Sequence, residues 1–160
     1  MVISYNRLWL LAFLLPLSTF IGFSQNTFVP DDNFEQALID LGFDTPPLDG
    51  FVPTANINTI TELNVSLLNI SDLTGIEDFR ALEVLECSEN NLTQLDISQN
   101  VNLKQLFCGF NVIESLDISL NSELLILWCN FNRIANLDVS NNPNLISLIC
   151  SNNLLIELDV

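Results

Sequence analysis

The sequence predicts a solenoid, in which short repeats stack beside one another around one continuous apolar core. Two regularities support this prediction: cysteines recur at intervals of 21 residues, and the leucines around them recur with the same period. The cysteines are Cys87, Cys108, Cys129 and Cys150. Complete units begin at residues 82, 103 and 124, and an incomplete unit begins at residue 145. A fixed period of this length indicates stacked supersecondary units, none of which can bury its apolar face alone.

The sequence motif of the repeats specifies this fold class further. Each unit reads L-x-x-L-x-C-x-x-N-x-(L/I), followed by a second half that contains L-D-(I/V). This pattern resembles the leucine-rich repeat, with cysteine in the third apolar slot. A divergent 22-residue unit at 60–81 contains I-S-D-L-T-G-I-E, which resembles the repeats of internalin-like bacterial surface proteins. The resemblance implies a β-rich α/β leucine-rich repeat solenoid over residues 60–160, with parallel strands stacked along a superhelix.

Residues 25–59 do not repeat and are predicted to form an N-terminal helical cap over the first repeat. Asp31 or Asp32 is placed to accept hydrogen bonds from the free amides of a helix start, and Gly42 is typical of a helix end. Residues 44–58 are rich in turn-forming residues and are predicted to be irregular. The apolar face of the predicted helix consists of Phe34, Ala37, Leu38 and Leu41.

The first 24 residues are predicted to be a signal peptide that is removed before Gln25. A short start with one positive charge precedes an apolar run, and Gly22 and Ser24 fit the small residues that signal peptidase requires. An uncleaved membrane anchor is the alternative. Pro16 interrupts the apolar run, however, and the run is shorter than the ~20 residues of a spanning helix. We therefore expect a secreted or cell-surface protein that has no membrane contact after cleavage.

Composition argues against several classes of function. The sequence contains four basic and 20 acidic residues, which give a formal net charge of −16. No cationic stripe is thus available to displace counterions from nucleic acid. Histidine is absent, which removes the usual general base and the commonest zinc ligand. Because no nucleophile–histidine pair, phosphate loop or metal-ligand spacing occurs, we expect no enzymatic activity and no cofactor.

Equivalent residues of successive repeats should stack as columns about 4.8 Å apart. The cysteine column is predicted to pack in the core as free thiols, because parallel side chains neither converge on a metal nor turn toward one another. Disulfides or a metal are the alternatives. Two asparagine columns are predicted to satisfy backbone groups at the bends of each repeat. They are Asn90, Asn111, Asn132 and Asn153, and Asn100, Asn121 and Asn142.

An aspartate column is expected to point outward from a second strand in each repeat. The column contains Asp96, Asp117, Asp138 and Asp159. These carboxylates are predicted to accept hydrogen bonds from the backbone or from neighbouring serines at a turn. A calcium site is the alternative, because calcium favours several carboxylate oxygens. A glycosidase-like carboxylate pair is the least favoured interpretation, because it needs a substrate cleft.

The candidate site lies on the first strand of each repeat. By strand alternation, the residues on either side of the buried leucine face away from the core, onto the predicted concave sheet. A tryptophan and three phenylalanines on this face would form an apolar patch of the kind that soluble proteins reserve for contacts. Alternatively, the rings cover one another or contact a missing domain. The predicted binding residues are Phe107, Phe110, Ile126, Trp128, Phe131 and Ile149.

The expected function is a non-enzymatic extracellular binding module whose concave face engages a protein or a glycan. The alternative is a structural spacer that forms the N-terminal part of a larger secreted protein with its activity downstream. The last unit stops at Val160, 16 residues into its 21-residue period. The sequence is therefore expected to be a fragment of a longer protein, with an end covered by a partner as the alternative.

Overall fold

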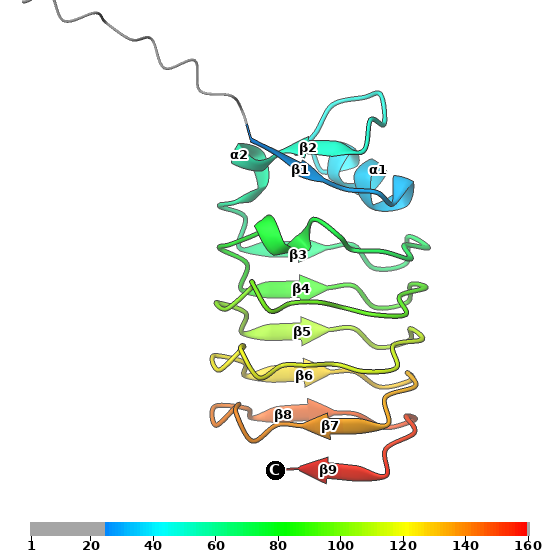
Figure 1. Cartoon of the computed structure of the whole chain (residues 1–160), viewed down its shortest axis with the longest axis vertical. Helices are drawn as coiled ribbons and strands as arrows, with labels where there is room; N and C mark the ends of the chain where they lie inside the picture. The colour runs from blue at the N-terminus through cyan, green and yellow to red at the C-terminus, as the bar shows by residue number, and fades with distance from the viewer. Residues whose placement is uncertain (1–24, 160) are drawn as a thin grey trace, which may run out of the picture.

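One strand from each repeat contributes to a parallel sheet that runs the length of the molecule (Figure 1). The computed structural model describes residues 25–159, so the predicted signal peptide lies outside the described residues. Within this range the five-stranded sheet has the order β3-β4-β5-β6-β8. Its strands are β3 (Glu62–Asn64), β4 (Val84–Glu86), β5 (Gln105–Phe107), β6 (Ile126–Trp128) and β8 (Ser147–Ile149).

The register of the sheet follows the sequence period. Val84 pairs with Gln105, Gln105 with Ile126, and Ile126 with Ser147, so each residue lies beside its equivalent in the next repeat. The middle residue of each strand is a leucine, and the first four of these leucines are buried. This arrangement confirms the predicted leucine-rich repeat solenoid with stacked parallel strands.

The second half of each repeat is less regular than expected. Only the last two repeats form strands there, β7 (Asn136–Asp138) and β9 (Glu157–Asp159), which pair in parallel. Residues 95–97 and 116–118 contain the same sequence motif but do not form strands. The backbone bond from Glu114 N to Thr93 O is 3.4 Å long, against 3.1 Å from Ile156 N to Ala135 O. The prediction of a second strand in every repeat is therefore wrong for these two earlier repeats, where the backbone pairing is looser.

Both asparagine columns satisfy the backbone, as predicted. In the first column, Asn111 Nδ2 donates to the carbonyls of Cys87 and Cys108 at 3.0 and 3.1 Å, and its Oδ1 accepts from Leu92 N at 3.0 Å. In the second column, Asn121 Nδ2 donates to the carbonyls of Ile97 and Asn100 at 3.1 and 2.9 Å. The buried Oδ1 atoms of the second column, in contrast, have no partner in the described part of the chain.

The N-terminal unit mixes helix and strand. Strand β1 (Asn26–Phe28) pairs antiparallel with β2 (Phe51–Pro53), which leads into the short helix α2 (Thr54–Ile57). The expectation that residues 44–58 are irregular is therefore wrong for this part. Helix α1 (Asp32–Asp40) forms where expected, and Asp31 Oδ1 caps it by accepting from the amides of the second and third residues that follow. Leu41 ends this helix and is 48% exposed, so it does not belong to the buried face as predicted.

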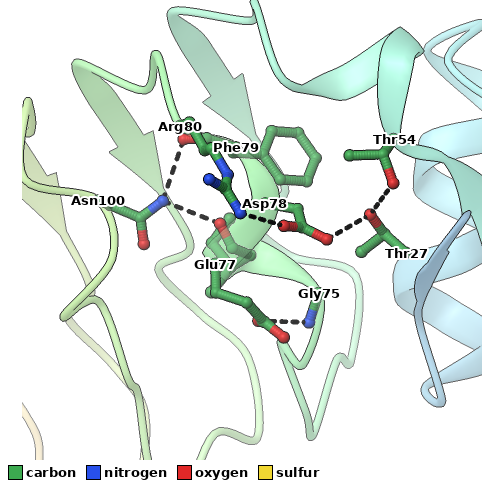
Figure 2. Close-up of polar contacts among 9 residues, drawn as sticks. Thr27, Thr54, Gly75, Glu77, Asp78, Phe79, Arg80 and Asn100 are labelled. Carbon is green, nitrogen blue, oxygen red and sulfur yellow. Dashed lines mark hydrogen bonds and ion pairs between the residues drawn. The ribbon is translucent and has the colours of Figure 1, made fainter. Parts of the chain in front are cut away.

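Hydrogen bonds and one close approach fasten this unit to the first repeat. Figure 2 shows Thr27 between Thr54 and Asp78; its Oγ1 donates to Asp78 Oδ2 at 2.7 Å and lies 2.8 Å from Thr54 Oγ1. Asp78 ends the 3₁₀ helix η1 (Ile76–Asp78). Gly75 precedes it with φ +106°, and a Cβ there would lie 2.8 Å from the carbonyl oxygen of Phe28. Glycine is therefore required at this contact.

Candidate functional site

Phe107 and Trp128 form the first half of an aromatic cluster on the outer face of the main sheet, hereafter the sheet face. They are the last residues of β5 and β6 and pair directly in register. Their ring centroids are 4.9 Å apart with an interplanar angle of 85°, an edge-to-face contact. Trp128 is 41% exposed, and its Nε1 donates to Ser147 Oγ at 3.2 Å. The outward orientation predicted for these residues is confirmed.

Phe110 and Phe131 form the second half of the cluster, just past the ends of the same strands. Their rings are stacked, with centroids 4.4 Å apart and an interplanar angle of 13°. Both residues have left-handed backbone conformations, with φ of +55° and +54°. This conformation costs about 1–2 kcal/mol for a residue with a Cβ. Their backbones are held there by hydrogen bonds from their own amides to carbonyls of the next repeat, each 2.9 Å long.

Aromatic residues at a left-handed position are unusual, because glycine or asparagine adopts this conformation more readily. The equivalent residue in the last repeat, Asn152, follows that preference with φ +56°. Phe110 and Phe131 nevertheless remain 49% and 45% exposed. Backbone strain held at exposed side chains often marks a functional site. Glu89 has the same conformation one repeat earlier, with φ +56°, so the repeat sets this backbone and the phenylalanines occupy it.

The remaining predicted residues flank the cluster. Ile126 begins β6 and is half-buried, whereas Ile149 ends β8 and is 38% exposed. All six predicted residues therefore lie on one face over three neighbouring repeats. The alternative that the rings cover one another is true in part, since each ring contacts one other. Both contacts leave a large exposed apolar surface.

Three glutamates, which sequence reasoning did not single out, adjoin the cluster on the side of the N-terminal unit. Glu86 pairs in register with Phe107, Glu62 begins β3, and Glu89 occupies the left-handed position that precedes Phe110 by one repeat. The described ion pairs are Arg80–Asp78 and Lys104–Glu83. None of these three carboxylates thus pairs with a basic residue of the described chain. Glu86 and Glu89 belong to the same outward columns as the aromatic residues but were not among the predicted binding residues.

The aspartate column serves the backbone. The carboxylates of Asp96, Asp117 and Asp138 accept from the amide of the serine two residues later, at 2.9, 2.9 and 2.8 Å. Two hydrogen bonds from Ser98 lower the pKa of Asp96 below its ordinary value. The bond from the amide has the larger effect and the bond from the hydroxyl the smaller one. The predicted turn role is confirmed for these three residues; the side chain of Asp159 lies outside the described ones. Among the described side chains, no group of three or more potential ligands could hold a metal ion.

The cysteine column packs into the core, as predicted. Cys87, Cys108 and Cys129 are buried free thiols, and Cys150 is a half-buried free thiol. Burial raises the pKa of the Cys87 and Cys129 thiols to about 12. Since the thiolate is the reactive form, these side chains are chemically inert near neutral pH.

A depression of about 730 Å³ lies over the aspartate side of the repeats. Its lining contains no aromatic residue and includes four carboxylates, each of which accepts a hydrogen bond from a residue two positions away in its own loop or turn. These carboxylates are thus already engaged within the fold. The sheet face, with its exposed rings and with glutamates that have no basic partner in the described chain, is the stronger candidate for binding. The four carboxylates belong to Asp72, Glu77, Asp96 and Asp117.

Comparisons with known proteins agree with this fold. No protein-family profile matches the chain. The functional domain of InlJ from Listeria monocytogenes, which includes a cysteine ladder, superposes with a TM-score of 0.78 and 36% identity over 86% of this chain and 31% of that one. The fold is that of an internalin-like leucine-rich repeat protein. An internalin, InlF, from the same species matches with a TM-score of 0.68 at 21% identity, over 81% of this chain and 46% of that one.

The sequence comparison points the same way as the internalin-like fold. The chain is 39% identical over 77 residues to Internalin J of Listeria monocytogenes. That match covers 48% of this chain and 8% of Internalin J. The chain therefore spans a small part of the length of the relatives that it resembles. In the described residues, no helix is both long and apolar enough to cross a membrane.

Proposed function

We propose that this chain is a non-enzymatic extracellular binding module whose sheet face engages a protein or a glycan. The exposed aromatic cluster carries the proposal. Large apolar side chains with exposed surface favour association, because covering that surface removes it from water. Four such side chains lie together here, on two adjacent repeats. They are Phe107, Phe110, Trp128 and Phe131.

The cluster is also preorganised for binding. Trp128 is held by its hydrogen bond to Ser147 and by contact with Phe107. Phe110 and Phe131 hold each other by stacking. Little side-chain freedom is then lost when a ligand covers the rings, and preorganisation of this kind favours affinity. The stacked strands beneath the rings supply a rigid support.

A secreted or cell-surface location belongs to the same proposal. The predicted signal peptide at 1–24 supports export of the chain. The similarity to an internalin-like fold supports a role in adhesion or surface recognition, since repeat solenoids offer extended binding surfaces. The proposal includes neither a nucleic-acid partner nor a membrane contact after signal cleavage.

A structural spacer is the second candidate function. It is favoured by the ring–ring contacts, which bury part of the cluster within the chain itself. A spacer would use the rings only to stiffen the stack, and the activity would belong to another part of a longer protein.

The experiment that separates the two is a binding screen of the exported protein on a glycan array and an array of extracellular proteins. Each positive is tested against Trp128→Ala and against Leu120→Ala, which removes a 57% exposed side chain elsewhere on the surface. A binding module loses its ligand with Trp128→Ala and keeps it with Leu120→Ala. Ligands that bind all three proteins equally, or no ligand at all, would contradict the proposal and favour the spacer.

A further inference from the structure

We infer that the partner is a protein whose contact surface places cationic side chains beside an apolar anchor. The apolar anchor covers the aromatic cluster, and the cations lie over Glu86 and Glu89. This inference rests on the proposed binding function and specifies its ligand. It also fixes the direction in which the partner lies along the stack of repeats.

The geometry of the rings favours an apolar side chain over a sugar. Stacking on a sugar requires an open aromatic face. Phe110 and Phe131 each cover one face of the other, because their planes are nearly parallel and 4.4 Å apart. Phe107 and Trp128 meet edge to face. The only hydrogen-bond donor among these four side chains, Trp128 Nε1, is already bonded to Ser147.

The aliphatic neighbours favour the same kind of anchor. Ile126 lies beside the cluster on β6, and Ile149 follows Trp128 in the same column, paired in register. Together with the rings they form a continuous apolar surface over β5, β6 and β8. Apolar surfaces of this kind are typical of protein contact sites, whose energetic centres contain aromatic anchors.

The charge next to this surface favours a cationic partner. One column along the sheet face reads Glu86, Phe107, Trp128, Ile149, and a second reads Glu89, Phe110, Phe131, Asn152. From β4 onward, each column starts with a carboxylate and continues without charge; the β3 residue paired with Glu86 is the neutral Asn64. Glu89 is exposed and Glu86 half-exposed, and Glu86 accepts one hydrogen bond, from Asn64 Nδ2 at 2.9 Å.

These carboxylates lack a counterion in the described chain. Lys104 pairs with Glu83 at 2.8 Å, and Arg80 pairs with Asp78 at 3.4 Å. Glu62 begins the neighbouring strand β3, in register with Val84, and adds a further exposed carboxylate on this side. Like charges on neighbouring strands repel one another, and a cation placed between them relieves that repulsion. The partner therefore supplies the missing positive charge.

The asymmetry sets the orientation of the partner. Carboxylates lie only at the end of the cluster nearest the N-terminal unit, while Ile149 and Asn152 end the columns without charge. Arg133, an exposed basic residue, belongs to the repeat of Phe131, two repeats beyond that of Glu89. A partner that turned its cations toward Arg133 would meet a like charge instead of Glu86 and Glu89. Complementary charge of this kind selects orientation and accelerates association.

The test uses a phage-displayed library of random peptides, selected on the immobilised exported protein, with a glycan array in parallel. Two double variants carry the same change in net charge: Glu86→Gln/Glu89→Gln at the site and Glu114→Gln/Glu123→Gln on exposed glutamates elsewhere. Trp128→Ala reports on the cluster. All variants are first compared with the parent by circular dichroism and urea unfolding.

The expected outcome is enrichment of peptides that combine Lys or Arg with a large apolar residue. Their binding is lost with Trp128→Ala, weakened about fivefold by the site double variant, and unchanged in the control double variant. Replacing the peptide cation by Ala should weaken binding to the parent but not to the site double variant, because the two changes remove the same interaction.

Two outcomes overturn the inference while the binding function survives. One is Trp128-dependent binding of peptides whose affinity ignores both Glu86→Gln/Glu89→Gln and the peptide charge. The other is Trp128-dependent binding to glycans alone. A third outcome, in which neither library yields any ligand sensitive to Trp128→Ala, overturns the proposed function together with the inference.

Discussion

The carboxylate of Asp31 accepts hydrogen bonds from both the amide and the hydroxyl of Ser71, at 2.8 and 2.7 Å, although 40 residues separate the two in sequence. The accepting atom is Oδ2, while Oδ1 caps helix α1. One side chain therefore both starts the helix of the N-terminal unit and ties that unit to the first repeat. The free energy of this joint can be measured at a single position.

Asp31→Ala should lower the free energy of unfolding by about 1–2 kcal/mol. The substitution removes a helix cap, which alone contributes about 1 kcal/mol, and also leaves the Ser71 and Asp72 amides without their acceptor. Urea unfolding measures the change. Asp32→Ala, on the exposed first turn of the same helix, is the matched control and should be nearly neutral. Equal losses in the two variants would show that the joint contributes nothing.

The same carboxylate should make stability depend on acid. Burial raises the pKa of Asp31, but hydrogen bonds from Ser71, Phe34 and Asp72 outweigh burial and hold it below its ordinary value of 3.8. Because the folded pKa is the lower one, the stabilisation is complete above the ordinary value and is lost as pH falls through the folded pKa. As pH falls below the ordinary value of 3.8, Asp31→Asn should therefore lose less stability than the parent. Parallel curves of unfolding free energy against pH would refute this.

The two asparagine columns should differ in their contribution to stability. Asn111 donates to three carbonyls and accepts from one buried amide, whereas Asn121 donates to two carbonyls and leaves its Oδ1 without a partner in the described chain. Asn111→Ala should cost about 2–4 kcal/mol, and Asn121→Ala about 1 kcal/mol less, because only Asn111 also accepts from a buried amide. Chemical denaturation of the two variants measures the difference. The prediction fails if Asn121→Ala is the more harmful substitution.

The thiols should divide into protected and accessible groups. In the folded protein at pH 8, a maleimide should modify at most Cys150, because Cys87, Cys108 and Cys129 are buried. The pKa of about 12 for the Cys87 and Cys129 thiols leaves almost no thiolate at that pH. After denaturation without reductant, mass spectrometry should count four modified cysteines. A count below four would reveal disulfides and contradict the packing of free thiols.

Replacing both strained phenylalanines should separate stability from binding. Asparagine relieves the left-handed strain of about 1–2 kcal/mol at each position, while the lost stacking contributes about 0.5–1.5 kcal/mol. Phe110→Asn/Phe131→Asn should therefore be as stable as the parent or slightly more stable. Its binding to Trp128-dependent ligands should nevertheless fall sharply. A variant that unfolds readily would show that the stacked pair supports the fold.

Sequence alone predicted the features that repeat. The period gave the register of β4, β5 and β6, and strand alternation placed Trp128 and Phe107 on the outer face. Features that depend on contacts between distant segments could not be predicted. The pairing of β1 with β2 is one example, because residues 26–28 and 51–53 become a sheet only when they meet.

Local backbone conformation could not be predicted from the sequence either, where contacts with neighbouring repeats determine it. Nothing in the residue type of Phe110 or Phe131 suggests a left-handed backbone, which is set by hydrogen bonds from the next repeat. Leu41 fits the apolar spacing of α1, but the helix ends there and leaves the side chain at the surface. Glu86 and Glu89 were visible in the columns, yet they stand out only once the aromatic cluster beside them is located.

The 21-residue period of the repeats has a consequence for how such a surface can change during evolution. Buried columns hold the same residue or a similar aliphatic one in every unit, whereas one column of the sheet face holds Glu, Phe, Trp and Ile in succession. Duplicating, deleting or exchanging a whole unit would rearrange the outer residues and leave the register beneath them intact. The molecule can therefore acquire a different recognition surface by recombination within its own gene, without rebuilding its interior.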